Sequence, residues 1–166
     1  LEKKIIKLGK KKLINITKLI GSDVILGINP KNTILSSNGK LTKLKKKLNF
    51  YVLIVKPNFG CSTKIIYSKL VNYSKAKYNK PKKSLLSTNS IINSTNELEN
   101  VVIKKYPKLK NLKLFLSKLP NIIFERMTGS GSSVVAYFYS KKAADIGAKK
   151  FRKKYKNYWY ITSKTI

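Results

Sequence analysis

The sequence contains no histidine, and Cys61 is the single cysteine among its 166 residues. The absence of histidine excludes a histidine general base, histidine metal ligands and the Ser-His-Asp arrangement of many hydrolases. One cysteine excludes an internal disulfide and a cysteine-built zinc site, and it fits a reducing compartment. Any proton transfer must therefore rely on other ionisable groups.

Acidic residues are also scarce, with six against 37 lysines and arginines, so the formal charge is +31. Such a charge is typical of proteins that bind nucleic acid. However, only Arg126 and Arg152 carry the bidentate guanidinium that base and phosphate recognition favours. The lysines are scattered beside many Ile and Asn residues, and all three have AT-rich codons. Genome composition therefore explains the charge, and we predict no specific nucleic-acid partner. The alternative, a basic nucleic-acid-binding domain, requires lysines clustered on one face and a steep salt dependence of affinity.

Long hydrophobic runs are absent as well. The longest clear one, Tyr51–Val55, is far too short to span a bilayer. Residues 1–20 lack the arrangement of a signal peptide. We therefore expect a soluble, cytoplasmic protein with no membrane partner. The chain begins at Leu1 within a Lys-rich amphipathic pattern, which we interpret as a piece of a longer protein.

Hydrophobic periodicity predicts an α+β fold with helices on one face of an antiparallel sheet. Helices are expected at 3–20, 62–70, up to 105, 108–118 and after Ser140. The helix that ends near 105 begins at a capping pattern, either Ser94-x-x-Glu97 or Asn96-x-x-Glu99. Strands are expected at 24–28, 33–36, 41–44, 49–55, 122–126, 134–139 and 158–162. Asn38–Gly39 is a typical hairpin turn, and 72–95 is expected to be a loop with a short helix near 83–87.

Asp23 stands apart from the other acidic residues. It lies at the break between a predicted helix and a predicted apolar strand, where a carboxylate would be partly desolvated and able to accept a proton. Glu97 and Glu99 are explained by the first turn of a helix, where the helix dipole favours carboxylates. Asp145 lies among lysines of a helix. The simpler interpretation of Asp23, as a turn or capping residue, stays open.

Two loops have compositions suited to anion binding. In the segment 128–133, glycines allow a close approach of the backbone to a ligand, and successive N–H groups form a nest. The segment lacks the spacing and terminal Lys of a Walker loop. The second loop, 57–63, precedes a predicted helix whose N-terminus presents free N–H groups. Each pattern alone is also typical of an ordinary turn.

Taken in this order, four segments resemble the motifs of the GHMP kinases. They are Gly21-Ser22-Asp23-Val24-Ile25-Leu26, Pro57-Asn58-Phe59-Gly60-Cys61-Ser62-Thr63 with Tyr67 after it, Asn96-Glu97-Leu98-Glu99 with Tyr106-Pro107 after it, and Arg126-Met127-Thr128-Gly129-Ser130-Gly131-Ser132. Ile25 replaces a Pro of the family and Glu97 replaces an Asp, and neither change removes Asp23.

The resemblance implies a role for each site residue. Asp23 would be the catalytic carboxylate that takes the proton of the substrate hydroxyl. Thr63 would line the substrate, and Tyr67 would stack on a cytosine ring. The glycine-rich loop, made of Thr128, Gly129, Ser130 and Gly131, would lie near the phosphates. No residue is assigned to a metal.

The resemblance also implies a domain organisation and a function. Residues 1–48 would end the N-terminal, ATP-binding and catalytic domain, and 49–166 would form the C-terminal domain. We expect ATP-dependent phosphorylation of a hydroxyl group on a cytidine diphosphate derivative in isoprenoid precursor synthesis, with ATP and Mg²⁺ required.

The family's Gly-rich ATP loop and its early-strand Lys have no counterpart in this sequence, so the chain alone is expected to be inactive. The alternatives are another GHMP kinase, of the homoserine or mevalonate type, and a folded remnant without catalysis. The sequence predicts no oligomeric state.

Overall fold

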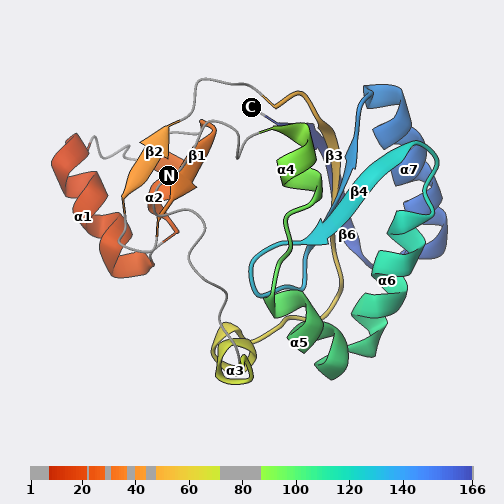
Figure 1. Ribbon diagram of the computed structural model, residues 1–166, viewed down its shortest axis with the longest axis horizontal. Helices are drawn as coiled ribbons and strands as arrows, with labels where there is room; N and C mark the ends of the chain where they lie inside the picture. The colour runs from red at the N-terminus through yellow and green to blue at the C-terminus, as the bar shows by residue number, and fades with distance from the viewer. Residues whose placement is uncertain are drawn as a thin grey trace, which may run out of the picture. The chain divides into compact units, whose positions relative to one another are not determined.

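The computed structural model describes residues 8–21, 23–28, 31–36, 40–43, 48–71 and 87–165. The chain divides into two compact units (Figure 1). The first unit consists of Leu1–Lys46 and Ala76–Lys83, and the second consists of Lys47–Lys75 and Ser84–Ile166. The assignment of 1–48 and 49–166 to two kinase domains stays a prediction.

The first unit contains α1 (Lys10–Ile20), α2 (Ile25–Ile28), β1 (Thr33–Leu35) and β2 (Leu41–Lys43). Helix α1 ends at Gly21, whose N–H bonds the carbonyl of Thr17. Strands β1 and β2 pair antiparallel, which confirms the predicted hairpin. Its turn, 38–39, and the predicted helical residues 3–7 lie outside the described residues.

The strand predicted at 24–28 is wrong. Ile25–Ile28 is a short helix, and the N–H groups of Leu26 and Gly27 bond the carbonyls of Asp23 and Val24, three residues back. Local bonds of this kind satisfy the backbone without a neighbouring strand. The apolar, β-branched composition of the segment therefore misled the prediction, because periodicity is weakly informative in so short a run.

Among its described residues, the second unit contains both strands and helices, with four successive helices between its first two strands. Its elements are β3 (Tyr51–Lys56), α3 (Thr63–Ser68), α4 (Thr88–Ile92), α5 (Leu98–Lys105), α6 (Pro107–Ser117), β4 (Ile122–Met127), β5 (Val134–Phe138), α7 (Lys141–Lys154) and β6 (Trp159–Lys164). The short helix predicted near 83–87 falls mostly outside the described residues, and α4 begins directly after it. Hydroxyl caps open three helices: the Oγ atoms of Ser62, Ser87 and Ser140 each accept a backbone N–H.

The four strands form one sheet in the order β4-β5-β3-β6, and each neighbouring pair is antiparallel. Both central strands are rich in apolar residues, and Leu53 of β3 lies opposite Ala136 of β5. Helices α5, α6 and α7 pack on one face of this sheet. The α+β prediction, with helices on one face of an antiparallel sheet, is therefore confirmed.

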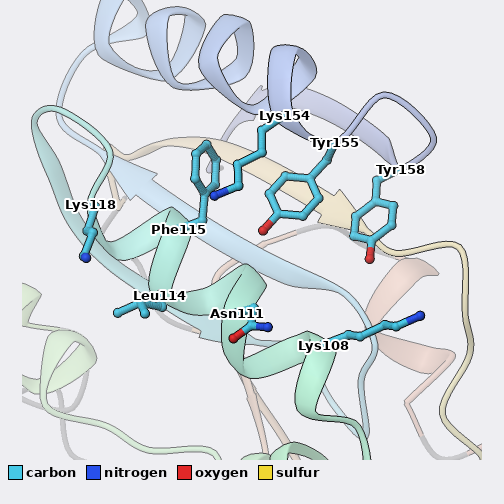
Figure 2. A pocket seen from close by; sticks show the side chains of 8 residues that line it. All are labelled: Lys108, Asn111, Leu114, Phe115, Lys118, Lys154, Tyr155 and Tyr158. Carbon is cyan, nitrogen blue, oxygen red and sulfur yellow. The ribbon is translucent and has the colours of Figure 1, made fainter.

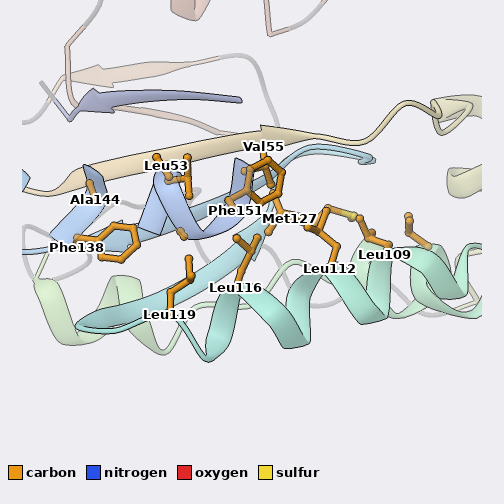
Figure 3. Close-up of a cluster of buried hydrophobic side chains, with 14 of the residues drawn as sticks. Leu53, Val55, Leu109, Leu112, Leu116, Leu119, Met127, Phe138, Ala144 and Phe151 are labelled. Atoms are coloured by element: carbon orange, nitrogen blue, oxygen red, sulfur yellow. The ribbon is translucent and has the colours of Figure 1, made fainter. Parts of the chain in front are cut away.

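One hydrophobic core joins the sheet to these helices (Figure 3). Alternate strand residues point into it, including Leu53, Val55 and Phe138, while α6 contributes a row of leucines one turn apart. The predicted inner face of α7 is buried as expected, with Gly147 close to the ring of Phe138. The core holds the strand ends in place, and the two loops of the candidate site connect at those ends.

Two kinds of feature are absent from the described residues. No helix combines the length and apolar composition that a membrane crossing requires. Likewise, within the described ranges no three His, Cys, Asp or Glu side chains gather as a metal cluster would need.

Candidate functional site

The glycine-rich loop connects β4 to β5 and closes as a compact turn. The Thr128 N–H bonds the carbonyl of Ser133 at 2.9 Å, and the Gly131 N–H bonds the carbonyl of Thr128 at 2.9 Å. Gly129 and Gly131 have φ angles of +50° and +84°, a region in which glycine carries no steric cost. The backbone of this turn therefore favours glycine at both positions.

The two glycines face different surroundings. A Cβ atom on Gly131 would lie 2.9 Å from Met127 Sδ and 3.3 Å from Cys61 Sγ, so this side of the loop is packed. A Cβ atom on Gly129 would have no protein atom within 4 Å. The loop is thus fixed to the second unit at Gly131 and leaves space for a ligand at Gly129.

The second loop, 57–62, lies against the first. The Ser132 hydroxyl donates to the carbonyl of Phe59 at 2.5 Å, and Ser132 itself is buried. The ring of Phe59 stacks on that of Tyr106, with centroids 5.6 Å apart and planes 16° from parallel. The hydroxyl bond and the ring stack hold the two loops together at one end of the sheet.

Two of the predicted site residues come into direct contact across these loops. The hydroxyls of Thr63 and Ser130 lie 2.8 Å apart, and both are accessible to solvent. Thr63 is the first residue of α3, and Tyr67 follows one turn later with 48% of its surface exposed. The structure therefore joins the predicted substrate segment to the predicted glycine-rich loop.

A polar network behind the loop was not predicted from sequence. Asn96 Nδ2 donates to the carbonyls of Met127 and Gly129 at 2.9 and 2.8 Å. Glu99 Oε2 accepts the Met127 N–H at 3.0 Å, and Glu99 Oε1 lies 2.5 Å from Lys113 Nζ. The helix dipole therefore accounts for only part of the role of Glu99. The Asn96-x-x-Glu99 spacing was the available signal, since it places both side chains at the start of α5.

Arg126 anchors the strand that leads into the loop. Its Nη2 donates to the carbonyls of Ile91 and Ile92, at 2.9 and 3.1 Å, near the end of α4. Its guanidinium also lies over the ring of Phe124, 4.9 Å from the centroid. Arginine presents donors and a planar face together, which lysine does not. One of the two arginines of the chain therefore has a structural role.

Burial raises the pKa of four ionisable groups of the second unit, of which Tyr155 is one. It raises the pKa of the Cys61 thiol, so Cys61 remains protonated beside the loop and is a poor nucleophile. It likewise raises the pKa of Tyr137. Burial also raises the pKa of Glu125, with the Glu99 carboxylate adding to the rise and Lys113 opposing it. None of these groups has the depressed pKa of an activated nucleophile.

Asp23 belongs to the first unit, whereas the other predicted site residues belong to the second. Asp23 precedes α2, and its carbonyl accepts the Leu26 N–H. Asp23 is exposed in this chain. The expectation that it is partly desolvated is therefore wrong for this chain.

A separate hollow of about 460 Å³ lies between α6 and α7 (Figure 2). Its wall includes Lys108, Lys118 and Lys154 together with the rings of Phe115, Tyr155 and Tyr158. Lys154 Nζ lies 5.0 Å from the centroid of Phe115, so this cation is already paired with an aromatic face. None of the predicted site residues lines this hollow.

Comparisons with known proteins agree with these motifs. Residues 81–157 match the family model described as "GHMP kinases C terminal". The 4-diphosphocytidyl-2-C-methyl-D-erythritol kinase of Pelagibacter ubique is 51% identical to this chain, and the match extends over all 166 residues of the chain. The chain spans 59% of the length of that relative.

Solved structures show the same fold at low identity. A crystal structure of 4-(cytidine 5'-diphospho)-2C-methyl-D-erythritol kinase superposes with a TM-score of 0.72 at 18% identity, covering 90% of this chain and 56% of that one. A homoserine kinase from Cytophaga hutchinsonii gives a TM-score of 0.64 at 17% identity, covering 86% and 50%. The family model, the close relative and the shared fold lead to one conclusion: this chain belongs to the GHMP kinase family.

Proposed function

We propose that this chain is the C-terminal part of a kinase that phosphorylates the 2-hydroxyl of 4-diphosphocytidyl-2-C-methyl-D-erythritol with ATP. The carrying observation is the 51% identity over the whole chain to a relative named for that activity. The contact between Thr63 and Ser130 supports the proposal, because it brings the proposed substrate segment to the proposed phosphate loop. The reaction would take place in the cytoplasm and serve isoprenoid precursor synthesis.

In this proposal each site residue has one task. Asp23 accepts the proton of the substrate hydroxyl as that oxygen attacks the γ-phosphorus of ATP, and ADP leaves. Thr63 and Tyr67 hold the cytidine end of the substrate, with the exposed Tyr67 ring available for stacking. The loop at Thr128–Gly131 lies close to the phosphates.

The residues of the loop fit a phosphate-bearing ligand. Gly129 leaves open space where a side chain would otherwise block the backbone, and the hydroxyls of Thr63 and Ser130 offer hydrogen-bond partners. Mg²⁺, when bound with ATP, neutralises charge on the phosphates and is commonly held by those phosphates with only one or two carboxylates. We therefore propose that Mg²⁺ arrives with ATP.

The test is an assay of the complete protein that carries this chain. We expect ATP-dependent phosphorylation of 4-diphosphocytidyl-2-C-methyl-D-erythritol and much slower turnover of homoserine and mevalonate. The phosphorylated products can be measured by ³¹P NMR. Preferred turnover of either of those alcohols would assign the protein to another branch of the family. The isolated 166-residue chain should consume ATP only at background level, because it lacks the family's ATP loop.

A matched pair of variants tests the proposed base. Asp23→Asn should lower kcat by about 10²- to 10⁴-fold, the usual contribution of a general base. Asp145→Asn makes the same chemical change on α7 and should leave kcat unchanged. Equal activity of the two variants would remove Asp23 from the mechanism.

A further inference from the structure

The side chain of Asn96 spans two carbonyl groups of the glycine-rich turn. Its Nδ2 donates to Met127 O and to Gly129 O, at 2.9 and 2.8 Å, while its Oδ1 accepts the Leu98 N–H at 3.1 Å. An amide group has two N–H donors and one carbonyl acceptor. Each of these groups is therefore bonded to backbone, and Asn96 links the start of α5 to both sides of Thr128.

Glu99 binds the same turn at the second backbone group of Met127, its N–H. Its Oε2 accepts the N–H of Met127, whose carbonyl is held by Asn96. Its Oε1 pairs with Lys113 Nζ, which also contacts Glu125 Oε2 at 3.3 Å. Both main-chain polar groups of the residue that leads into the loop are thus bound by side chains of one helix start.

Packing at Gly131 and the hydrogen bond of Ser132 hold one end of the loop, whereas Gly129 has no such packing. Glycines have no side chains to pack and lose the most conformational freedom when they are ordered. Gly129 has no neighbouring protein atom where its Cβ would be. The position of Ser130, and with it the 2.8 Å contact to Thr63, therefore depends on bonds to the loop backbone as well as on the packing at Gly131.

We propose that Asn96 is a positioning residue of the kinase: it sets where the loop Thr128–Gly131 stands relative to Thr63, and Glu99 is its second support. This inference deepens the proposed function and rests on it for its effect on turnover. Displacing a ligand-holding group by about 1 Å can reduce turnover about 10²-fold. The loop geometry itself can be measured without any assay of activity.

Asn96→Asp is the sharpest variant because it is nearly isosteric. A carboxylate oxygen still accepts the Leu98 N–H, so the start of α5 is kept, but both donors to the loop are lost. The carboxylate would then face the carbonyls of Met127 and Gly129. Since this arrangement disfavours the charged form, the pKa of the new carboxyl should be raised. Once protonated, it can donate one hydrogen bond back to the loop.

The matched control is Asn100→Asp. It makes the same chemical change and adds the same charge on α5, where Asn100 is exposed. Amide hydrogen exchange at Thr128 and Gly131 reports loop order, because both N–H groups are bonded inside the turn. At neutral pH we expect about tenfold faster exchange at both amides in Asn96→Asp, as for the loss of one or two hydrogen bonds. Asn100→Asp should match the wild type.

The pH dependence separates positioning from a general loss of stability. The ratio of exchange rates between Asn96→Asp and the wild type, compared at each pH, should fall towards one as the medium is acidified. In the complete protein, kcat of Asn96→Asp should be about 10- to 100-fold below that of Asn100→Asp at neutral pH. The difference in kcat between Asn96→Asp and Asn100→Asp should become smaller on acidification. A protein that is merely destabilised would not show this change.

The outcomes are distinguishable. Wild-type exchange rates at the loop amides of folded Asn96→Asp, or kcat equal to that of Asn100→Asp, would overturn the positioning role and leave the proposed function standing. Faster loop exchange in a protein whose wild type phosphorylates nothing would uphold the positioning and refute the function. Should Asn96→Asp not fold, Asn96→Ser keeps a capping hydroxyl but cannot span both carbonyls. It should show the faster exchange without the recovery at low pH, and wild-type exchange would overturn the role.

Discussion

The two compact units differ in how much apolar surface their described residues bury. The second unit has a continuous core between the sheet and three helices, with side chains such as Leu112, Leu116 and Phe151 fully buried. Among the described residues of the first unit, Ile34 is the one buried apolar side chain, and Leu19 is 87% exposed. Helices α1 and α6 both carry leucines, but only α6 has leucines that contribute fully buried apolar surface to the stability of their unit. Apolar pattern alone does not stabilise a unit, since the surface must also be removed from water.

The largest expected effect tests this comparison with one substitution in each unit. Leu116→Ala empties space in the core of the second unit and should lower the free energy of unfolding by about 2–5 kcal/mol. Leu19→Ala removes the same atoms from an exposed position and should change it by less than about 0.5 kcal/mol. Urea unfolding followed by Trp159 fluorescence is suitable, because this single tryptophan lies in β6 of the second unit.

Hydrogen exchange provides the control for that experiment. Amides of β3 and β5 should exchange much more slowly than those of α1, and Leu116→Ala should accelerate the strand amides selectively. Equal losses of stability in the two variants would show that the units unfold as one and that Leu19 is buried in solution. The contrast between the units would then be lost.

Most of the second unit was predictable because its signals are local and long enough to be distinct. The run 134–139 has the nearly continuous apolar composition of a central strand, and the small residues of 140–151 mark a helix face that packs closely. Ser62 and Ser140 were recognisable caps. The segment 24–28 was mispredicted because a short apolar run suits a strand and a helical turn equally.

The candidate site was predictable only in part. The glycines at 129 and 131 predicted a loop with a closely approachable backbone. The structure explains both through their positive φ angles and explains Gly131 also through its close packing. The links of Asn96 and Glu99 to the loop join residues about thirty positions apart. Hydrogen bonds of that range have no periodicity, so the Asn96-x-x-Glu99 spacing predicts a helix start but does not predict its partners in the loop. The roles of Asp23, Thr63 and Tyr67 stay predictions.

Glycine substitutions give an intermediate effect that again contrasts the units. Gly131→Ala places a Cβ 2.9 Å from Met127 Sδ at a φ of +84°, so it should destabilise the second unit by about 1–3 kcal/mol. Gly27 lies in α2, and a Cβ atom added there would have no neighbour within 4 Å. Gly27→Ala should therefore be neutral or stabilising by about 0.5 kcal/mol. Both variants can be compared by thermal unfolding, and a stabilised Gly131→Ala would contradict the packing seen at the loop.

The smallest expected effect concerns the pH dependence of stability and resides in Glu125 of β4. Burial raises the pKa of this carboxyl above its ordinary value of 4.5. The folded state therefore binds the proton more tightly than the unfolded state. The resulting stability is fully present below the ordinary pKa and is lost as the pH rises through the folded pKa. Glu125→Gln cannot ionise, so it should match the wild type in acid and become more stable than it at neutral pH.

A second substitution sharpens this prediction, because Lys113 lowers the pKa of Glu125 while burial and Glu99 raise it. Lys113→Met removes the attraction, so the pKa of Glu125 should rise further. The stability difference that Glu125→Gln produces at neutral pH should therefore be larger in the Lys113→Met protein than in the wild type. Thermal midpoints from below to above pH 4.5 would measure this difference in both proteins. Equal differences in the two proteins would mean that water screens the Glu125 carboxylate from Lys113. The second unit would then be more hydrated at Glu125 than its buried core suggests.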